Sequence, residues 1–190
     1  MLFPDADRTL ELVPHCSSVS RNGWVGDHDI RPLSDHGHQQ ADALVAALGT
    51  DVDAIFSSPA LRCRQTVEPL ARAANRPIET LEELAEGDGF RKPEAWTEGP
   101  LAPMAGPVAG AWAAGRMLRA LTIMVDRGAG GRVVASSHGD VIPVLLATLS
   151  GISSTPLPRL VPRGGWFRIR LVQGTVAITA HDGVSTYASG

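Results

Sequence analysis

The sequence predicts an α/β fold, a three-layer α/β/α sandwich with a mostly parallel central sheet. Short apolar segments of strand type alternate along the chain with longer segments whose apolar residues recur at helical spacing. This alternation is typical of a parallel sheet that carries helices on both faces. The chain has 190 residues, of which 44% are hydrophobic and 19% charged, so it can bury one sizeable core. We therefore expect a single domain over residues 1–190.

The first half of the chain is predicted to open with a strand that Pro14 ends. Ser34 is a suitable N-cap for the first helix, and Ser58 with Pro59 fits the N-cap and first position of the second. Pro69 can bend that second helix. The expected elements are a strand at 9–13, a loop at 15–33, a helix at 34–48, a strand at 53–57, a helix at 58–74 and a short strand at 77–80.

The second half begins with an irregular stretch rich in Gly and Pro, residues 84–107. Irregular stretches of this length often form lids, and we expect a lid or cap here. Asp140 can cap a later helix, and Gln173-Gly174 fits the turn of a terminal hairpin. The expected elements are a helix at 108–126, a strand at 132–136, a helix at 141–149 and hairpin strands at 165–172 and 175–181.

Composition excludes several classes of protein. The 17 basic residues, 16 Arg and Lys92, are scattered and form no stripe for nucleic acid, and the net charge is −3. Two cysteines, Cys16 and Cys63, cannot build a disulfide scaffold or a four-cysteine zinc site. Two acidic residues stand where a signal peptide needs positive charge, and the apolar stretch at 107–125 contains two arginines. We expect a soluble cytoplasmic protein that binds neither nucleic acid nor membrane.

Three candidate functional residues follow predicted strands or open the next helix: His15, Arg62 and His138. In an α/β sheet ligands collect at the carboxyl ends of the strands, which would bring these side chains together. A neutral imidazole can accept a phosphoryl group, and an arginine fork near a helix N-terminus can hold the phosphate. Each residue alone is better explained by a turn, a core position or a solvated helix start, and only the combination makes a phosphate site as plausible as these explanations.

Three segments carry a resemblance to a known family. They are Leu12-Val-Pro-His15, Ser57-Ser-Pro-Ala-Leu-Arg62-Cys-Arg-Gln-Thr66 and Val134-Ala-Ser-Ser-His138-Gly139. Their order and spacing resemble those of the histidine phosphatase superfamily, whose fold is called phosphoglycerate mutase-like. The stretch Arg31-Pro-Leu-Ser-Asp-His-Gly37 is similar to the small SixA-like phosphohistidine phosphatase branch, and to the phosphatase domains fused to Nudix hydrolases.

The resemblance implies a role for each residue of the central group. His15 would be the nucleophile that accepts the phosphoryl group, and Arg62 and His138 would hold the phosphate. The family reaction needs no metal or cofactor, and the histidines lack metal-ligand spacing, so we expect neither. The substrate implied is a phosphate monoester or a phosphohistidine.

The proton donor for the leaving group has three candidates. Glu83 matches the family position best, Glu86 is the second choice and Asp140 the third. Solvated acidic surface explains Glu83 and Glu86 equally well, and helix capping is the preferred explanation for Asp140. Ser57 and Ser17 could donate to phosphate, although hydrogen bonding within a buried turn is the preferred role. Plausible rim residues, each with an exposed surface position as its default, are Arg21, Arg31, Arg64 and His28.

Pro14 departs from the family pattern, because the resemblance implies an arginine immediately before the nucleophile. Proline has neither charge nor N–H, and losing one preorganised donor typically slows a reaction about 10²–10³-fold. We expect a working phosphatase with altered or weakened phosphate binding, with Arg21 or Arg64 as substitutes. Two alternatives stay open: a pseudoenzyme that binds a phosphorylated ligand or a protein partner, and an enzyme repurposed for acid–base chemistry with His15 and His138, as in specialised metabolism.

The segments that would shape the substrate pocket, 17–33 and 84–107, carry Trp24, Phe90 and Trp96 and few charges. Such a wall favours a partly apolar small-molecule substrate, although loop aromatics also pack loops down. Cys16 and Cys63 follow His15 and Arg62 directly and are expected to pack as apolar thiols behind the site. The sequence leaves the oligomeric state open.

Overall fold

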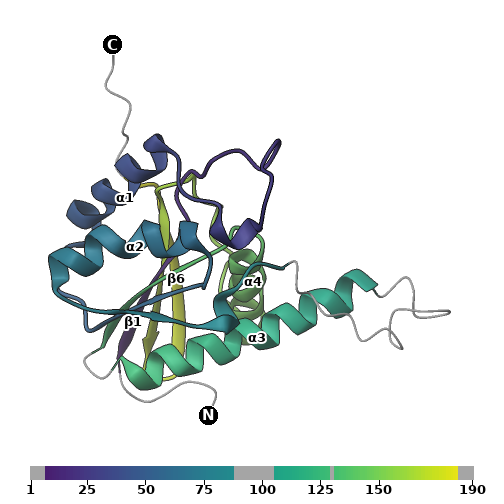
Figure 1. The fold of residues 1–190 in the computed structure, drawn as a ribbon. Helices are drawn as coiled ribbons and strands as arrows, with labels where there is room; N and C mark the ends of the chain where they lie inside the picture. The colour runs from purple at the N-terminus through teal and green to yellow at the C-terminus, as the bar shows by residue number, and fades with distance from the viewer. Residues whose placement is uncertain (1–6, 88–104, 129–130, 184–190) are drawn as a thin grey trace.

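The computed structural model describes residues 7–87, 105–128 and 131–183 (Figure 1). Its elements follow one another in the alternating order that the sequence predicts. They are β1 (Arg8–Pro14), η1 (His28–Ile30), α1 (Asp35–Leu48), β2 (Ala54–Ser57), α2 (Leu61–Ala74), β3 (Ile78–Thr80), η2 (Glu82–Leu84), α3 (Ala105–Arg127), β4 (Arg132–Ser137), α4 (Val141–Ser153), β5 (Trp166–Val172) and β6 (Thr175–His181), where η marks a short 3₁₀ helix.

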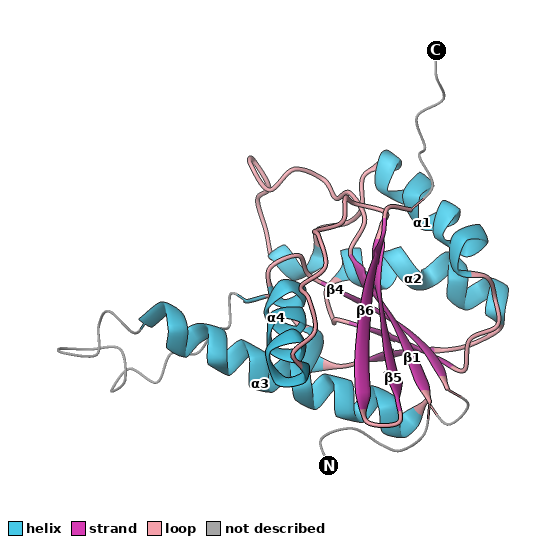
Figure 2. Cartoon of the chain, turned by 180° about the vertical axis from the view of Figure 1, so that it is seen from behind, coloured by secondary structure: helices cyan, strands magenta, loops and turns pink. Residues whose placement is uncertain are grey.

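The six strands form one sheet in the order β3-β2-β4-β1-β5-β6. The four strands from β3 to β1 run parallel, whereas β5 is antiparallel to β1 and β6 is antiparallel to β5. Helices α1 and α2 cover one face of the sheet and α3 and α4 cover the other (Figures 1 and 2). The predicted three-layer sandwich with a mostly parallel sheet is confirmed.

The pleat of the strands divides the core into two layers. Leu12, Phe56 and Ala135 face α3 and α4, whereas Val13, Ile55 and Val134 face α1 and α2. This alternation matches the apolar pattern that identified the strands in the sequence. Because β1, β2, β3 and β4 are parallel, their carboxyl ends lie at one edge of the sheet, where the loops after them meet.

Helix caps follow the predictions in two of three cases. The Ser34 side chain accepts a hydrogen bond from Gly37 N and begins α1, and Asp140 accepts one from Val141 N at the start of α4. The predicted start of α2 at Ser58-Pro59 is wrong: Ala60 is the N-cap and no side chain caps this end. The Ser58 hydroxyl is instead used at the edge of the sheet, as described below.

Several other boundaries also differ from the predicted ones. Pro14 is the last residue of β1, where a missing N–H is tolerated, and it pairs in register with Ser137 of β4. Helix α4 continues to Ser153, and α3 begins at Ala105, three residues before the predicted start. Residues 88–104, most of the lid predicted over 84–107, lie outside the described residues, as do Phe90 and Trp96.

Within the described residues, α3 contains the one segment, Val108–Arg127, that is long and apolar enough to cross a membrane. Its Met117, Leu121 and Met124 side chains are buried in the same cluster as Leu12 and Phe56 of the sheet. One face of the segment therefore packs on the sheet, and the segment also carries Arg116 and Arg119.

Candidate active site

His15 immediately follows β1 at the edge of the sheet where the parallel strands end. Its backbone N–H donates to Ser137 O at 2.8 Å, which continues the β1–β4 ladder by one residue. Its ring Nδ1 lies 2.8 Å from the carbonyl oxygen of Cys16. Because a carbonyl only accepts, Nδ1 carries the proton and Nε2 keeps a free lone pair. The local fold therefore presents His15 in the tautomer that a nucleophile at Nε2 requires.

The surroundings of His15 keep its ring neutral. The residue is 4% exposed. Burial, followed by the positive charge of Arg163, lowers the pKa of His15 to about 3. The ring is therefore uncharged at neutral pH, as nucleophilic attack by an imidazole requires.

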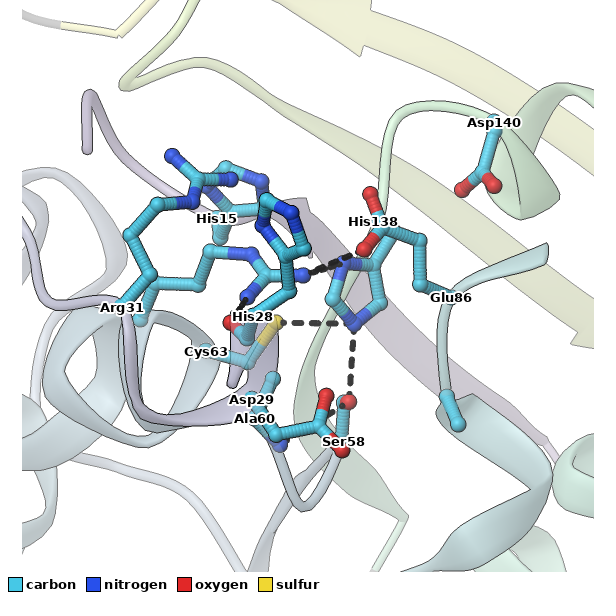
Figure 3. A network of polar contacts seen from close by, with 12 residues as sticks. His15, His28, Asp29, Arg31, Ser58, Ala60, Cys63, Glu86, His138 and Asp140 are labelled. Carbon is cyan, nitrogen blue, oxygen red and sulfur yellow. Dashed lines mark hydrogen bonds and ion pairs between the residues drawn. The ribbon is translucent and has the colours of Figure 1, made fainter. Parts of the chain in front are cut away.

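His138 follows β4 and faces His15. The two ring centroids are 5.5 Å apart, and the rings meet edge to face at 72°. Burial and then the charge of Arg62 lower the pKa of His138 to about 2. Its Nδ1 lies 3.3 Å from Arg62 Nη2, a group that can only donate, so Nε2 carries the proton and donates to Ser58 Oγ at 2.8 Å (Figure 3).

Arg62 lies in the first turn of α2, and its side chain is fully buried. Its Nη1 donates to the carbonyl oxygen of His28 at 2.6 Å, and its Nη2 donates to Glu86 Oε2 at 2.6 Å. Thr66, one turn later, accepts from Cys16 N at 2.9 Å and donates to Arg62 O at 2.8 Å. One hydroxyl thus fixes the position of α2 relative to the loop that carries His15.

The structure brings Glu86, and not Glu83, into contact with Arg62. The Glu86 carboxylate bridges Arg62 and Arg21, with Oε1 3.3 Å from Arg21 Nη2. Glu83 pairs with Arg119 Nε at 3.0 Å on the α3 side. Asp140 accepts from Gly87 N at 2.7 Å and caps α4, and it stands apart from the two histidines in Figure 3.

The remaining candidate residues take different places around this edge. Arg31 is 6% exposed and donates to Ser18 Oγ and to the Val19 carbonyl, both at 2.5 Å. The Ser57 hydroxyl is fully buried and donates to Ser58 O at 2.8 Å, in keeping with a role within the turn. Arg64 is exposed on α2, and Ser17 donates its backbone N–H to Gln40.

Comparison with known proteins agrees with this geometry. The profile of the histidine phosphatase superfamily (branch 1) matches residues 12–182. The chain belongs to this superfamily. The matched range spans all of the edge residues described above, from His15 to His138.

Three similar proteins illustrate how far this chain resembles other members of the superfamily. It is 36% identical over 76 residues to the 8-oxo-(d)GTP phosphatase of Mycolicibacterium smegmatis, a match that covers 40% of this chain and 24% of the relative, so the chain spans about a quarter of that protein. The Bacillus stearothermophilus YhfR structure has a TM-score of 0.69 at 24% identity, covering 94% and 98% of the two chains. The structure of the protein histidine phosphatase SixA complexed with tungstate has a TM-score of 0.57 at 15% identity, covering 92% of this chain and 96% of that one.

Sequence reasoning missed Arg163, which lies at the same edge of the sheet. Arg163, in the loop between α4 and β5, donates from Nη1 to the carbonyl oxygen of His15 at 2.7 Å. Because β5 is antiparallel to β1, its amino end lies beside the carboxyl end of β1. The antiparallel direction of β5 is the signal that places Arg163 here, and the rule that ligands collect at the carboxyl ends of parallel strands does not cover it.

Both cysteines of the chain are free and buried next to the histidines. The Cys63 Sγ lies 3.5 Å from His138 Nε2, and Cys16 N–H donates to Thr66 as described above. Burial raises the pKa of Cys16 to about 11 and that of Cys63 to about 12. Both thiols are therefore neutral at physiological pH and pack as small apolar groups behind the site.

Proposed function

We propose that this chain hydrolyses a phosphate monoester or a phosphohistidine through a phosphoryl intermediate on His15. The observation that carries the proposal is the neutral His15 ring, whose Nε2 lone pair is free and whose neighbours are His138 and the buried Arg62. Membership in the histidine phosphatase superfamily supports the same reaction class.

In the first step His15 Nε2 attacks phosphorus, a P–N bond forms and the bond to the leaving oxygen breaks. That oxygen needs a proton, and Glu86 is the carboxyl group in contact with Arg62. Glu86 gives that proton to the leaving oxygen as its bond to phosphorus breaks. The products of this step are phosphohistidine and the free alcohol.

In the second step water attacks the phosphohistidine. Glu86, now ionised, accepts a proton from that water, the P–N bond breaks and inorganic phosphate leaves. His15 Nε2 recovers its lone pair, and Nδ1 keeps its proton on the Cys16 carbonyl throughout. Arg62 neutralises the equatorial oxygens in both steps by its fixed, buried charge.

The substrate is proposed to combine a phosphate with a partly apolar group. The loop before η1 and η1 itself, whose His28 carbonyl accepts from Arg62, expose three apolar side chains: Val19 is 37% exposed, Val25 96% and Ile30 59%. Trp24 is half-buried and donates to Asp27 O, so it packs this loop down. The relative from Mycolicibacterium smegmatis makes nucleoside phosphates one class of substrate to test.

Phosphoryl transfer to His15 tests the proposal directly. Wild type and H15A are incubated with phosphoramidate or acetyl phosphate, and intact-mass and acid-lability measurements then detect phosphohistidine. We expect an acid-labile phosphoryl group on the wild type alone, and hydrolysis of at least one ester in a panel of sugar phosphates, nucleotides, aryl phosphates and phosphohistidine. An unlabelled wild type that hydrolyses nothing contradicts the proposal.

Pro14 supports a second candidate function, the binding of a phosphorylated ligand without turnover. Its buried ring puts no donor beside the nucleophile. A chain of this kind would bind phosphate analogues but leave His15 unlabelled. Acid–base chemistry by His15 and His138 on a substrate without phosphate would give neither binding nor label. Labelling of His15 together with the binding of a phosphate analogue therefore separates all three functions.

A further inference from the structure

Phosphate binding at this edge needs more positive charge than Arg62 alone supplies. Both terminal nitrogens of Arg62 are already engaged, Nη1 with the His28 carbonyl and Nη2 with Glu86 and His138, while its buried Nε has no partner. Pro14, the residue before the nucleophile, carries neither charge nor N–H. A phosphate dianion is bound most strongly where guanidinium groups reach it from more than one side.

Arg163 brings a second guanidinium to the nucleophile. Its Nη1 donates to His15 O at 2.7 Å. Its Nη2 extends toward the turn after His138, since a Cβ added at Gly139 would lie 3.8 Å from that atom. The guanidinium therefore spans the two loops that carry the histidines, and no carboxylate of the described residues pairs with it.

The fold fixes the backbone of Arg163 relative to His15. Gln40 of α1 donates from Nε2 to Arg163 O at 3.0 Å and accepts from Ser17 N at 2.9 Å, so one side chain holds both loops. Gly164 has a left-handed φ of +86°, and a Cβ at Gly165 would lie 2.5 Å from the carbonyl oxygen of His181. Two glycines are thus required to turn the chain at this point into β5.

We propose that Arg163 is a second phosphate-binding guanidinium of this site, which supplies from the loop before β5 the charge that Pro14 does not. Nη1 stays on the His15 carbonyl while the other N–H groups reach the phosphoryl oxygens. The field of Arg163 already acts at the nucleophile, because it lowers the pKa of His15 more than Arg62 does. This inference rests on the proposed function of the same site.

Tungstate, a phosphate analogue, is the probe, and R163Q is compared with R159Q. Arg159 lies on the same loop, is exposed and pairs with Asp182, which makes it the matched control. Isothermal titration calorimetry should show at least a tenfold loss of tungstate affinity for R163Q and less than a twofold change for R159Q. For turnover we expect a loss of about 100-fold in kcat/KM, and P14R in the R163Q background should restore part of it.

R163K keeps the charge without the fork and should fall between wild type and R163Q. It also serves if R163Q fails to fold. Equal tungstate affinity in R163Q, R163K and R159Q overturns the inference, as does a wild type that binds no tungstate. A wild type that binds tungstate but leaves His15 unlabelled contradicts the proposed function, and the comparison of variants then still decides the role of Arg163.

Discussion

Arg62 and Glu86 form a 2.6 Å ion pair in which the arginine is completely buried. The pair joins the helix after β2 to the loop after β3, and its arginine also lies 3.3 Å from His138. Under the proposed function, a carboxylate in this place competes with phosphate for the guanidinium and exchanges a proton with the leaving group. The roles of the two neighbouring acids, Glu86 and Glu83, can therefore be separated by experiment.

We expect E86Q to lower kcat by about 10²–10⁴-fold for alkyl phosphates, whose leaving oxygen needs a proton. The loss should be much smaller for p-nitrophenyl phosphate, whose leaving group departs without one. E83Q is the matched control, since Glu83 contacts Arg119 and should stay within twofold of wild type for both substrates. Steady-state kinetics on the two ester classes measure the effect, and a larger loss in E83Q than in E86Q would assign the proton donor to Glu83.

The two buried histidines make folding stability depend on pH. Because the pKa of His15 in the folded state is about 3 and that of His138 about 2, each binds its proton more readily in the unfolded chain, near 6.5. Their stabilising effect is present above pH 6.5 and is lost as the pH falls below it. Between pH 6.5 and 5 each costs roughly 1.5 kcal/mol of unfolding free energy.

Urea denaturation of wild type, H15Q and H138Q at pH 6.5 and 5.0 measures this dependence. Each variant should lose less stability over this interval than wild type, by roughly 1.5 kcal/mol. Two-dimensional NMR should show both rings still neutral at pH 5 in the folded protein. Equal pH dependence in all three proteins would mean that the rings titrate normally.

The sequence predicts which side chains meet at the edge of the sheet where the residue follows a parallel strand or opens the helix after one. His15, Arg62 and His138 follow parallel strands or open the next helix, and the structure places them together. Arg163 was missed because its loop precedes an antiparallel strand, a direction that apolar periodicity does not encode.

The choice between the acids could not be made from sequence for a geometric reason. Glu83 lies within the 3₁₀ turn Glu82–Leu84, which directs it toward α3, whereas the chain is extended again at Ala85 and carries Glu86 to Arg62. Two acids three residues apart across such a turn therefore point to different partners, one to α3 and the other to Arg62. Likewise, Ser58 fits an N-cap by residue type, yet its hydroxyl lies 2.8 Å from His138, a contact 80 residues away in sequence.

The Thr66 hydroxyl is expected to affect both the stability of the fold and ligand binding at the site, and T66V tests both effects. Valine keeps the shape but removes the oxygen that accepts from Cys16 N, which leaves a buried N–H without its partner. We expect a loss of about 1–3 kcal/mol in unfolding free energy and weaker tungstate binding, because the loop next to His15 is released. T122V is the control, since Thr122 is exposed on α3 and bonds only its own helix. A T66V protein as stable as T122V would show that this hydrogen bond is dispensable.

Glu11 is the buried charge that holds three strands together away from the site. Its Oε1 accepts from Arg132 of β4 at 3.2 Å and from Arg168 of β5 at 2.8 Å, while Glu11 itself, on β1 between them, is fully buried. Removing the carboxylate leaves Arg132 and Arg168, which are 25% and 34% exposed, without their anion, so we expect E11A to lose about 1–3 kcal/mol of unfolding free energy. E79A, which breaks the exposed pair with Arg127, should lose less than about 1 kcal/mol. Urea denaturation at pH 7 measures both losses.

Arg132 also donates to the carbonyls of Leu48 and Asp51. E11A should therefore raise the rate of amide hydrogen exchange at the end of α1, a local effect that E79A does not share.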